Sequence, residues 1–272
     1  MNLLKKLFQA ISGQKYRNCP GGAVASQIEQ RALKAGLINS EQIMAYCDSC
    51  TTGLTRNSLT DGLGSNWDIR SPQEAAETLE SLIQYGHRFF YDIVFRVYRE
   101  GASEDGRHEV LEALVASGRY GHPETVWERI AAEESSEEKD LVFSALERAM
   151  DMLENLRSAF RLLKDKVNGQ YLPKDYSVGV LAWDLGRLVT VARMSLDCEY
   201  IEQHELNRIL AHVDSVLRSN FSSWPQFAKS YIIGRACWSG QNMMLGGIIG
   251  IAEDLMTDKN SPWVLSPLRV VD

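Results

Sequence analysis

The sequence lacks an excess of basic charge. Its 36 aspartates and glutamates outnumber its 29 lysines and arginines, which gives a net charge of −7. Phosphate backbones are bound by basic protein faces, so this balance argues against nucleic acid as the main partner. A basic protein partner is compatible with it, although acidity is also common among soluble cytosolic proteins.

Long apolar runs are missing as well. The longest nearly uncharged apolar stretch, residues 243–252, is about half of what a membrane span needs. The first residues do not form a secretory signal, because Lys5 and Lys6 interrupt the apolar positions and no small-residue cleavage site follows. We therefore expect no transmembrane segment.

Cysteine is scarce, and its number is odd. The five cysteines are widely scattered along the chain: Cys19, Cys47, Cys50, Cys198 and Cys237. Such a set does not resemble a disulfide framework, which indicates a reducing compartment and hence a cytoplasmic protein.

Recognisable metal and catalytic motifs are also lacking. Cys47 and Cys50 have the spacing of a redox pair or of half a zinc site, but no second such pair and no close histidine pair accompanies them. We expect both thiols to share a helix face with Ile43 and to pack there, and we expect no metal and no cofactor. No phosphate-binding glycine loop, nucleophile elbow or kinase set occurs. These absences favour a non-enzymatic role without excluding catalysis.

The apolar positions that are present recur with a helical period, and no convincing strand run appears. The pattern predicts an all-α fold: a single multi-helix globular bundle with a long helix over about 136–167. Ser71-Pro72 and the Ser223–Gln226 spacing are helix start signals. The stretch 51–70 is expected to be irregular and to be held to the body by Trp67.

Three regions of the chain are distinguished. Residues 1–20 form an amino-terminal amphipathic segment, and residues 21–272 form one all-α domain with a peripheral acidic insertion at about 101–138. Residues 1–12 have helical apolar spacing with two lysines off the stripe. Such a segment could lie on a membrane surface, but we favour docking on the domain or fraying.

One helix, at about 178–197, is expected to lie at the centre of the bundle. It is apolar nearly all round, which is typical of a buried helix. It nevertheless carries Asp184 and Arg187, next to Trp183. An isolated buried charge is very costly, so both charges must have partners.

These charges belong to a candidate polar cluster that several helices would contribute to. Its members are His87, Arg88, Asp184, Arg187 and Arg235, with aromatic support from Trp183, Trp224, Trp238 and Trp263. Arginine stacks on aromatic rings and forks onto carboxylates. The favoured interpretation is structural: Asp184 neutralises arginines and ties helices together. The alternative is an anion site, where arginines bind an anionic group, Asp184 orients them and His87 transfers a proton.

Several short motifs resemble a known family. They are Ala182-Trp183-Asp184-Leu185-Gly186-Arg187, Tyr200-Ile201, Ser223-Trp224, Tyr231, Gly234-Arg235, Ser261-Pro262-Trp263, and upstream Trp67-Asp68-Ile69 and Gly86-His87-Arg88. Together they resemble the bacterial domain-of-unknown-function family 1266 (the YbeU/YbeR-like proteins) over about residues 36–263. The segment 101–139 matches nothing in it. The resemblance implies an intracellular bacterial protein and names no reaction.

Two functions remain open at this stage. The first is a non-enzymatic binding protein, such as an immunity-type inhibitor or adaptor, that meets a basic protein partner through the acidic segment 124–138. The alternative is an enzyme or ligand sensor that binds a small anionic ligand at the arginine, aspartate and histidine cluster. The first is favoured, because the chain is acidic and shows no catalytic pattern.

Overall fold

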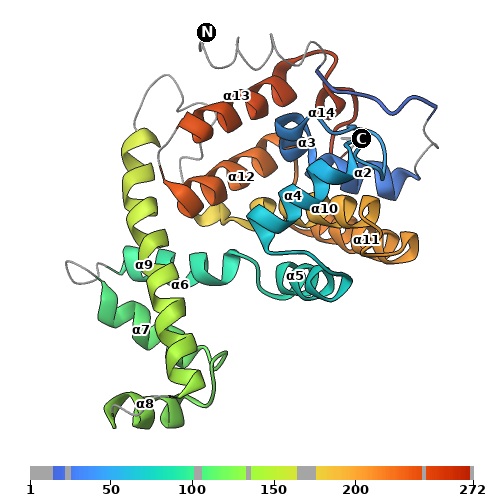
Figure 1. The fold of residues 1–272 in the computed structure, drawn as a ribbon. Helices are drawn as coiled ribbons and strands as arrows, with labels where there is room; N and C mark the ends of the chain where they lie inside the picture. The colour runs from blue at the N-terminus through green and yellow to red at the C-terminus, as the bar shows by residue number, and fades with distance from the viewer. Residues whose placement is uncertain are drawn as a thin grey trace.

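The computed structural model describes residues 15–21, 26–100, 106–132, 136–163, 176–240 and 243–269. Within these ranges the regular structure is entirely helical, which confirms the all-α prediction (Figure 1). Most of the amphipathic segment predicted for residues 1–20 lies outside the described residues. In chain order the elements are α2 (Gln27–Ala35), α3 (Leu37–Ile43), α4 (Arg56–Trp67), α5 (Pro72–Gln84), α6 (Arg88–Arg99), α7 (Arg107–Ala116), α8 (Pro123–Ala131), α9 (Glu137–Leu163), the 3-10 turn η1 (Tyr176–Val178), α10 (Leu181–Asp197), α11 (Gln203–Asn220), α12 (Trp224–Ser239), α13 (Met243–Thr257) and α14 (Pro262–Leu265).

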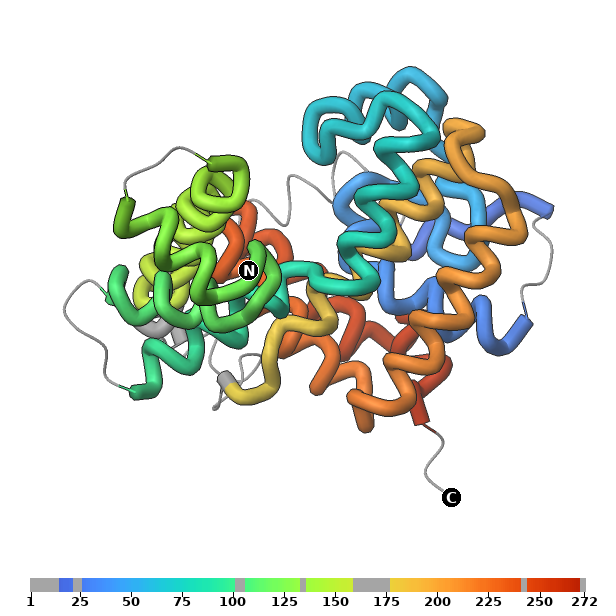
Figure 2. The backbone as a smooth tube through the Cα atoms, turned by 90° about the horizontal axis from the view of Figure 1, so that it is seen from below, coloured from blue at the N-terminus to red at the C-terminus, as the bar shows by residue number. Residues whose placement is uncertain are grey.

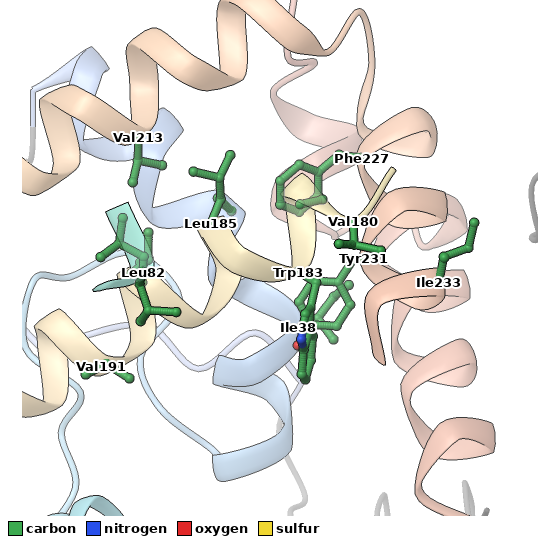
Figure 3. Packing of buried hydrophobic residues seen from close by; sticks show 14 of the residues in the cluster. Ile38, Leu82, Val180, Trp183, Leu185, Val191, Val213, Phe227, Tyr231 and Ile233 are labelled. Carbon is green, nitrogen blue, oxygen red and sulfur yellow. The ribbon is translucent and has the colours of Figure 1, made fainter. Parts of the chain in front are cut away.

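Helix α10 is the buried centre of the fold, as the sequence predicts. Helices α2, α3, α4, α5, α11 and α12 all pack against it, and most of its side chains are buried. A surface helix is buried only along one apolar stripe, whereas α10 is buried on nearly all sides. Figure 3 shows Trp183 of α10 beside Tyr231 of α12, with Leu82 of α5 and Val213 of α11 around the same helix.

Helices α7 and α8 and the first part of α9 project away from this core (Figures 1 and 2). We call residues 107–163 the arm. Helix α9 packs on α6, α7 and α8 and also on α12 of the core. A small apolar cluster of Val115, Val126 and Val142 holds the outer part of the arm together. Over the described residues 106–132, the region predicted as a peripheral insertion therefore consists of short helices at the edge of the molecule.

The long helix agrees with its predicted position over the residues that can be compared. The prediction was 136–167, and α9 spans Glu137–Leu163, while residues 164–167 lie outside the described residues. The predicted start signals also hold. Ser71 Oγ accepts from the backbone N–H of Glu74, and Ser223 Oγ accepts from that of Gln226, with a proline in the first turn of each helix.

The predicted helical face shared by Cys47 and Cys50 is wrong. Helix α3 begins just after Gly36 and ends at Ile43, where Met44 adopts a left-handed conformation with φ of 57°. Both cysteines therefore lie in the loop between α3 and α4. The backbone of this loop is held in place by Arg193 of α10, whose side chain donates to two of the loop's carbonyl oxygens.

The expectation of an irregular segment over 51–70 is also wrong. Helix α4 fills most of it and begins after Thr55, whose side chain accepts from the backbone N–H of Ser58. Gly62 and Gly64, which lie within α4, give the helix a weak intrinsic propensity. Leu59 and Leu63, four residues apart, are fully buried, and α4 contacts α10, so tertiary packing decides the outcome.

The apolar stretch at 243–252 lies on α13, which has 15 residues. Among the described residues, no helix combines the length and the apolar character that crossing a bilayer requires.

Candidate functional site

Asp184 lies in the first turn of α10, and its side chain is completely shielded from solvent. Four donors surround its carboxylate. Oδ1 accepts from the backbone N–H of His87 at 2.8 Å and from Nη2 of Arg187 at 2.5 Å. Oδ2 accepts from the backbone N–H of Arg88 at 3.0 Å and from its Nη1 at 3.2 Å. Two guanidinium groups and two amides thus compensate the buried charge.

The carboxylate caps a helix that is distant in sequence. His87, the residue before α6, has helical backbone angles, and its own side chain makes no capping bond. Asp184 takes that role from α10, since it binds the first free N–H groups of α6 and places a negative charge at the positive end of the helix dipole. The start of α6 is therefore fixed to the core by a residue of the central helix.

Gly86 makes this close approach possible. Its φ is +58°, a left-handed conformation that glycine adopts without strain. A Cβ atom at this position would lie 2.2 Å from Oδ2 of Asp184. No other residue type can occupy the position without displacing the carboxylate.

Arg88 extends the network to the preceding helix. Its Nη1 donates to the carbonyl of Leu82 at 3.1 Å, and its Nη2 donates to that of Ile83 at 2.5 Å. These carbonyls lie in the last turn of α5, where a cation also interacts favourably with the helix dipole. The end of α5, the start of α6 and the start of α10 thus meet at one ion network.

His87 itself lies between two groups that can only donate. Trp183 Nε1 lies 3.1 Å from Nδ1 of His87, and Arg187 Nη1 lies 3.2 Å from its Nε2. Burial, followed by the charges of Arg187 and Arg148, lowers the pKa of His87 to about 3. The ring is therefore neutral near pH 7, with one nitrogen protonated and only one able to accept.

Arg187 is held by stacking as well as by charge. Its guanidinium carbon lies 4.9 Å from the ring centre of Trp183 and 5.5 Å from that of Trp67. Its Nε is buried and has no hydrogen-bond partner. Burial lowers the pKa of Arg187, whereas the neighbouring Asp184 opposes that shift.

The structure brings together four of the predicted polar residues, and Arg235 is not among them. Arg235 donates to Ser239 Oγ and stacks on Trp238 at 5.1 Å. Within the described part of the chain it lies within 4 Å of no carboxylate, and burial lowers its pKa. Trp238 reaches the cluster through Trp183, with 6.0 Å between the ring centres.

The other two predicted aromatic residues do not support the cluster. Trp224 and Trp263 stack on each other in parallel at 5.1 Å, and both lie edge-to-face with Phe227. Their indole N–H groups donate to the carbonyls of Ser266 and Lys34 respectively. This pair fastens the carboxyl-terminal segment to the core instead.

Sequence reasoning missed several buried charges. Arg193 lies on α10, the same helix as Asp184, and is only 2% exposed. Burial lowers its pKa to about 10. Asp214 of α11 is 1% exposed and binds Arg31 and Arg218. The available signal was simply a charge within a strongly apolar helical pattern, which picked out Asp184 and Arg187 and applied equally to Arg193.

The two cysteines at positions 47 and 50 show no features of a reactive pair. The thiol of Cys47 donates to Asn18 Oδ1 at 3.0 Å, and burial raises its pKa to about 12. Burial also raises the pKa of Cys50. Both groups are therefore protonated thiols near pH 7 and poor nucleophiles. Over the described ranges, no group of three or more histidine, cysteine or acidic side chains is placed to hold a metal ion.

The chain was compared with known proteins. No curated protein and no solved structure matches it. A family model described as "Protein of unknown function (DUF1266)" matches residues 62–268, a range that contains α5, α6, the arm and the whole ion network. The chain therefore belongs to the DUF1266 family of proteins of unknown function.

Proposed function

We propose that this protein binds a small ligand bearing an oxyanion, and that the oxyanion accepts hydrogen bonds from His87 and Arg187. The observation that carries this proposal is the pair of obligate donors around His87. A neutral imidazole can accept from Trp183 or from Arg187, but not from both. One of the two contacts therefore joins two donors and lacks an acceptor.

An oxyanion supplies that acceptor. If Trp183 donates to Nδ1 of His87, the ring proton lies on Nε2 and faces the N–H of Arg187 Nη1, 3.2 Å away. An oxygen beside this contact, within hydrogen-bond distance of both nitrogens, would accept from both. The unpartnered Nε of Arg187 adds a third donor to the same region. Hydrogen bonds from a guanidinium to an anion are among the stronger ones in proteins.

The local charge also favours an anion. Asp184 forms ion pairs with both Arg88 and Arg187. The charge of Arg148 on α9 contributes to the lowered pKa of His87. The site is therefore locally positive in a chain whose net charge is −7.

Binding is better supported than proton-transfer catalysis. A general acid or base works best when its pKa lies near the working pH, and the pKa of His87 is about 3. We therefore infer a ligand sensor or binding protein, in which His87 donates or accepts hydrogen bonds as a neutral group.

The alternative of a basic protein partner has weaker support. Within the acidic segment Glu138 pairs with Arg129, and nearby on the arm Glu147 pairs with Arg107, so part of the negative charge is compensated within the chain. All five cysteines are free thiols, which supports the further proposal that the protein works in the reducing cytoplasm of a bacterium.

Thermal unfolding in the presence of simple anions tests the proposal. Sodium phosphate, sulfate and acetate would each be titrated at constant ionic strength against sodium chloride. A ligand that binds only the folded state raises the melting temperature in a saturable manner, by roughly 2 to 4 °C for each 1 kcal/mol in a chain of this size. We expect at least one oxyanion to do so with the wild type.

The matched variants are His87→Ala and, on the exposed face of α11, His212→Ala. The first should abolish the saturable shift, and the second should retain it. Arg187→Lys provides a second variant that keeps the positive charge if His87→Ala fails to fold. Equal shifts in all variants, or no oxyanion effect beyond that of chloride, would overturn the proposal.

A further inference from the structure

A ladder of side-chain contacts, cation–π at each end and between two tilted indole rings in the middle, connects Arg187 to the surface of the core. Arg187 stacks on Trp183 at 4.9 Å, the ring centres of Trp183 and Trp238 are 6.0 Å apart, and Arg235 stacks on Trp238 at 5.1 Å. The residues come from two helices, α10 and α12. A guanidinium group therefore stands at each end of the ladder, with two indole rings between them.

Both guanidinium groups have donors left over. Stacking on an indole uses the face of the guanidinium and leaves its N–H groups free at the edge. Arg187 has the unpartnered Nε and the donor that faces His87. The only hydrogen bond of Arg235 within the described chain goes to Ser239.

The members of the ladder differ in their access to solvent. Arg187 and Arg235 are each only 6% exposed, but Trp238 is 53% exposed. Tyr231 is fully buried, and the charges of both arginines act on its hydroxyl group. One end of the ladder thus lies at the ion network, and the other lies beneath an indole ring that opens to the surface.

A single simple ion is too small to satisfy both ends. The oxygens of one carboxylate or phosphate lie only about 2 to 3 Å apart, which suits one guanidinium fork, whereas the contacts that connect the two arginines pass through two indole rings. The uncompensated cation at Arg235 therefore needs a second anionic group. A short carbon chain beside Trp183 and Trp238 would join the two groups and contact apolar ring surface.

We propose that the ligand is an organic dianion, with one acidic group bound by His87 and Arg187 and the second bound by Arg235. This inference rests on the proposed oxyanion site and names the class of ligand for it. Arg235 is then the residue that determines specificity for a ligand with two acidic groups over one with a single group.

Isothermal titration with matched carboxylates tests this inference on the full chain. Succinate, glutarate and adipate would be compared with butyrate, valerate and hexanoate at constant ionic strength. We expect the best dicarboxylate to bind the wild type at least about tenfold more tightly than the monocarboxylate of equal length. Arg235→Gln should remove this preference.

Arg208→Gln, on an arginine whose side chain is 73% exposed, is the control and should keep the preference. If Arg235→Gln does not fold, Arg235→Lys should still reduce the preference, because lysine lacks the planar fork. Equal wild-type affinity for both classes would overturn the dianion inference while leaving the oxyanion site in place. A preference that survives in the Arg235 variants would overturn the role of Arg235. Binding of neither class would overturn the dianion inference, and the oxyanion site is then decided separately by the titration with phosphate, sulfate and acetate.

Discussion

The backbone N–H of His87 donates to Oδ1 of Asp184 across 2.8 Å, although 97 positions separate the two residues in the sequence. Through this bond the central helix α10 caps helix α6, and α6 packs against α9 of the arm. The buried carboxylate of Asp184 therefore helps to position the arm, together with the direct packing of α9 on α12. The same carboxylate fixes Arg187, which belongs to the proposed ligand site.

Replacing Asp184 with asparagine should destabilise the fold strongly. The substitution keeps the shape but removes the charge, and it leaves Arg88 and Arg187 without their counter-ion. Breaking a buried ion pair in this way costs about 3 to 5 kcal/mol of unfolding free energy. Urea denaturation measures the loss. Asp68→Asn is the control, because that side chain is 90% exposed in its pair with Arg70, and it should change stability by less than about 1 kcal/mol. A similar small effect for both variants would contradict the central role of Asp184.

Gly86→Ala should also be destabilising, for a steric reason. Gly86 and Gly118 have nearly the same left-handed backbone, with φ of 58° and 68°. A Cβ atom on Gly118 meets nothing within 4 Å, whereas one on Gly86 would overlap the carboxylate of Asp184. Gly118→Ala should therefore show only the backbone cost of about 1 to 2 kcal/mol.

The difference between the two alanine variants in chemical denaturation isolates the overlap. We expect Gly86→Ala to lose at least about 2 kcal/mol more than Gly118→Ala, because a rigid carboxylate must move. Equal losses would show that the loop before α6 relaxes without disturbing Asp184.

How far the sequence predicts this architecture is clear from α10. Its apolar residues all round the helix predicted a buried central element, and two charges on that background indicated where the polar network would lie. This works because burying an unpaired charge is so costly that a charge in such a pattern implies a partner. The identity of the partners was harder to predict. Arg88 binds Asp184, whereas Arg235, equally plausible from its position among aromatic residues, binds Ser239 and Trp238.

The missed elements share a different cause. Helix α4 forms despite weak local propensity because Leu59 and Leu63 pack into the core, and tertiary contacts of this kind leave little trace in a local pattern. The loop that carries Cys47 and Cys50 is likewise defined by a distant residue, Arg193. The periodicity of a segment indicates whether that segment can form an amphipathic helix. It carries no information on contacts made by side chains that are distant in the sequence.

The stability of the protein should fall below about pH 6.5 because of His87. Its pKa is about 3 in the folded chain, against 6.5 for an ordinary histidine. Between these values the unfolded chain binds a proton that the folded chain does not. Stability is therefore complete above the unfolded pKa and decreases as the pH falls, by at most about 1.4 kcal/mol per pH unit for this group.

The variant His87→Gln removes this one contribution. Urea denaturation from pH 8 to pH 5 should show that the stability difference between wild type and variant is constant above about pH 7.5. Below about pH 6.5 it should shift in favour of the variant. His212→Gln, an exposed histidine, should follow the wild type throughout. A pH-independent difference for His87→Gln would mean that the imidazole is not held neutral by its surroundings.

Arg193→Lys should release the loop that contains the two cysteines. Arg193 donates through Nη1 to Ser40 Oγ at 3.0 Å, and through Nη2 to the carbonyls of Tyr46 and Thr51 at 2.7 and 2.8 Å. A lysine ammonium lacks the fork that reaches these oxygens together. The carbonyls then lose their donors inside the protein, at a cost of about 2 to 4 kcal/mol.

The thiol of Cys47, which is 6% exposed with a pKa of about 12, should become accessible in this variant. Mass spectrometry after timed alkylation measures this directly, and we expect labelling of Cys47 at least about tenfold faster than in the wild type. Arg208→Lys on the exposed face of α11 should leave the rate unchanged, and an unchanged rate in Arg193→Lys would show that the loop holds its conformation without the arginine.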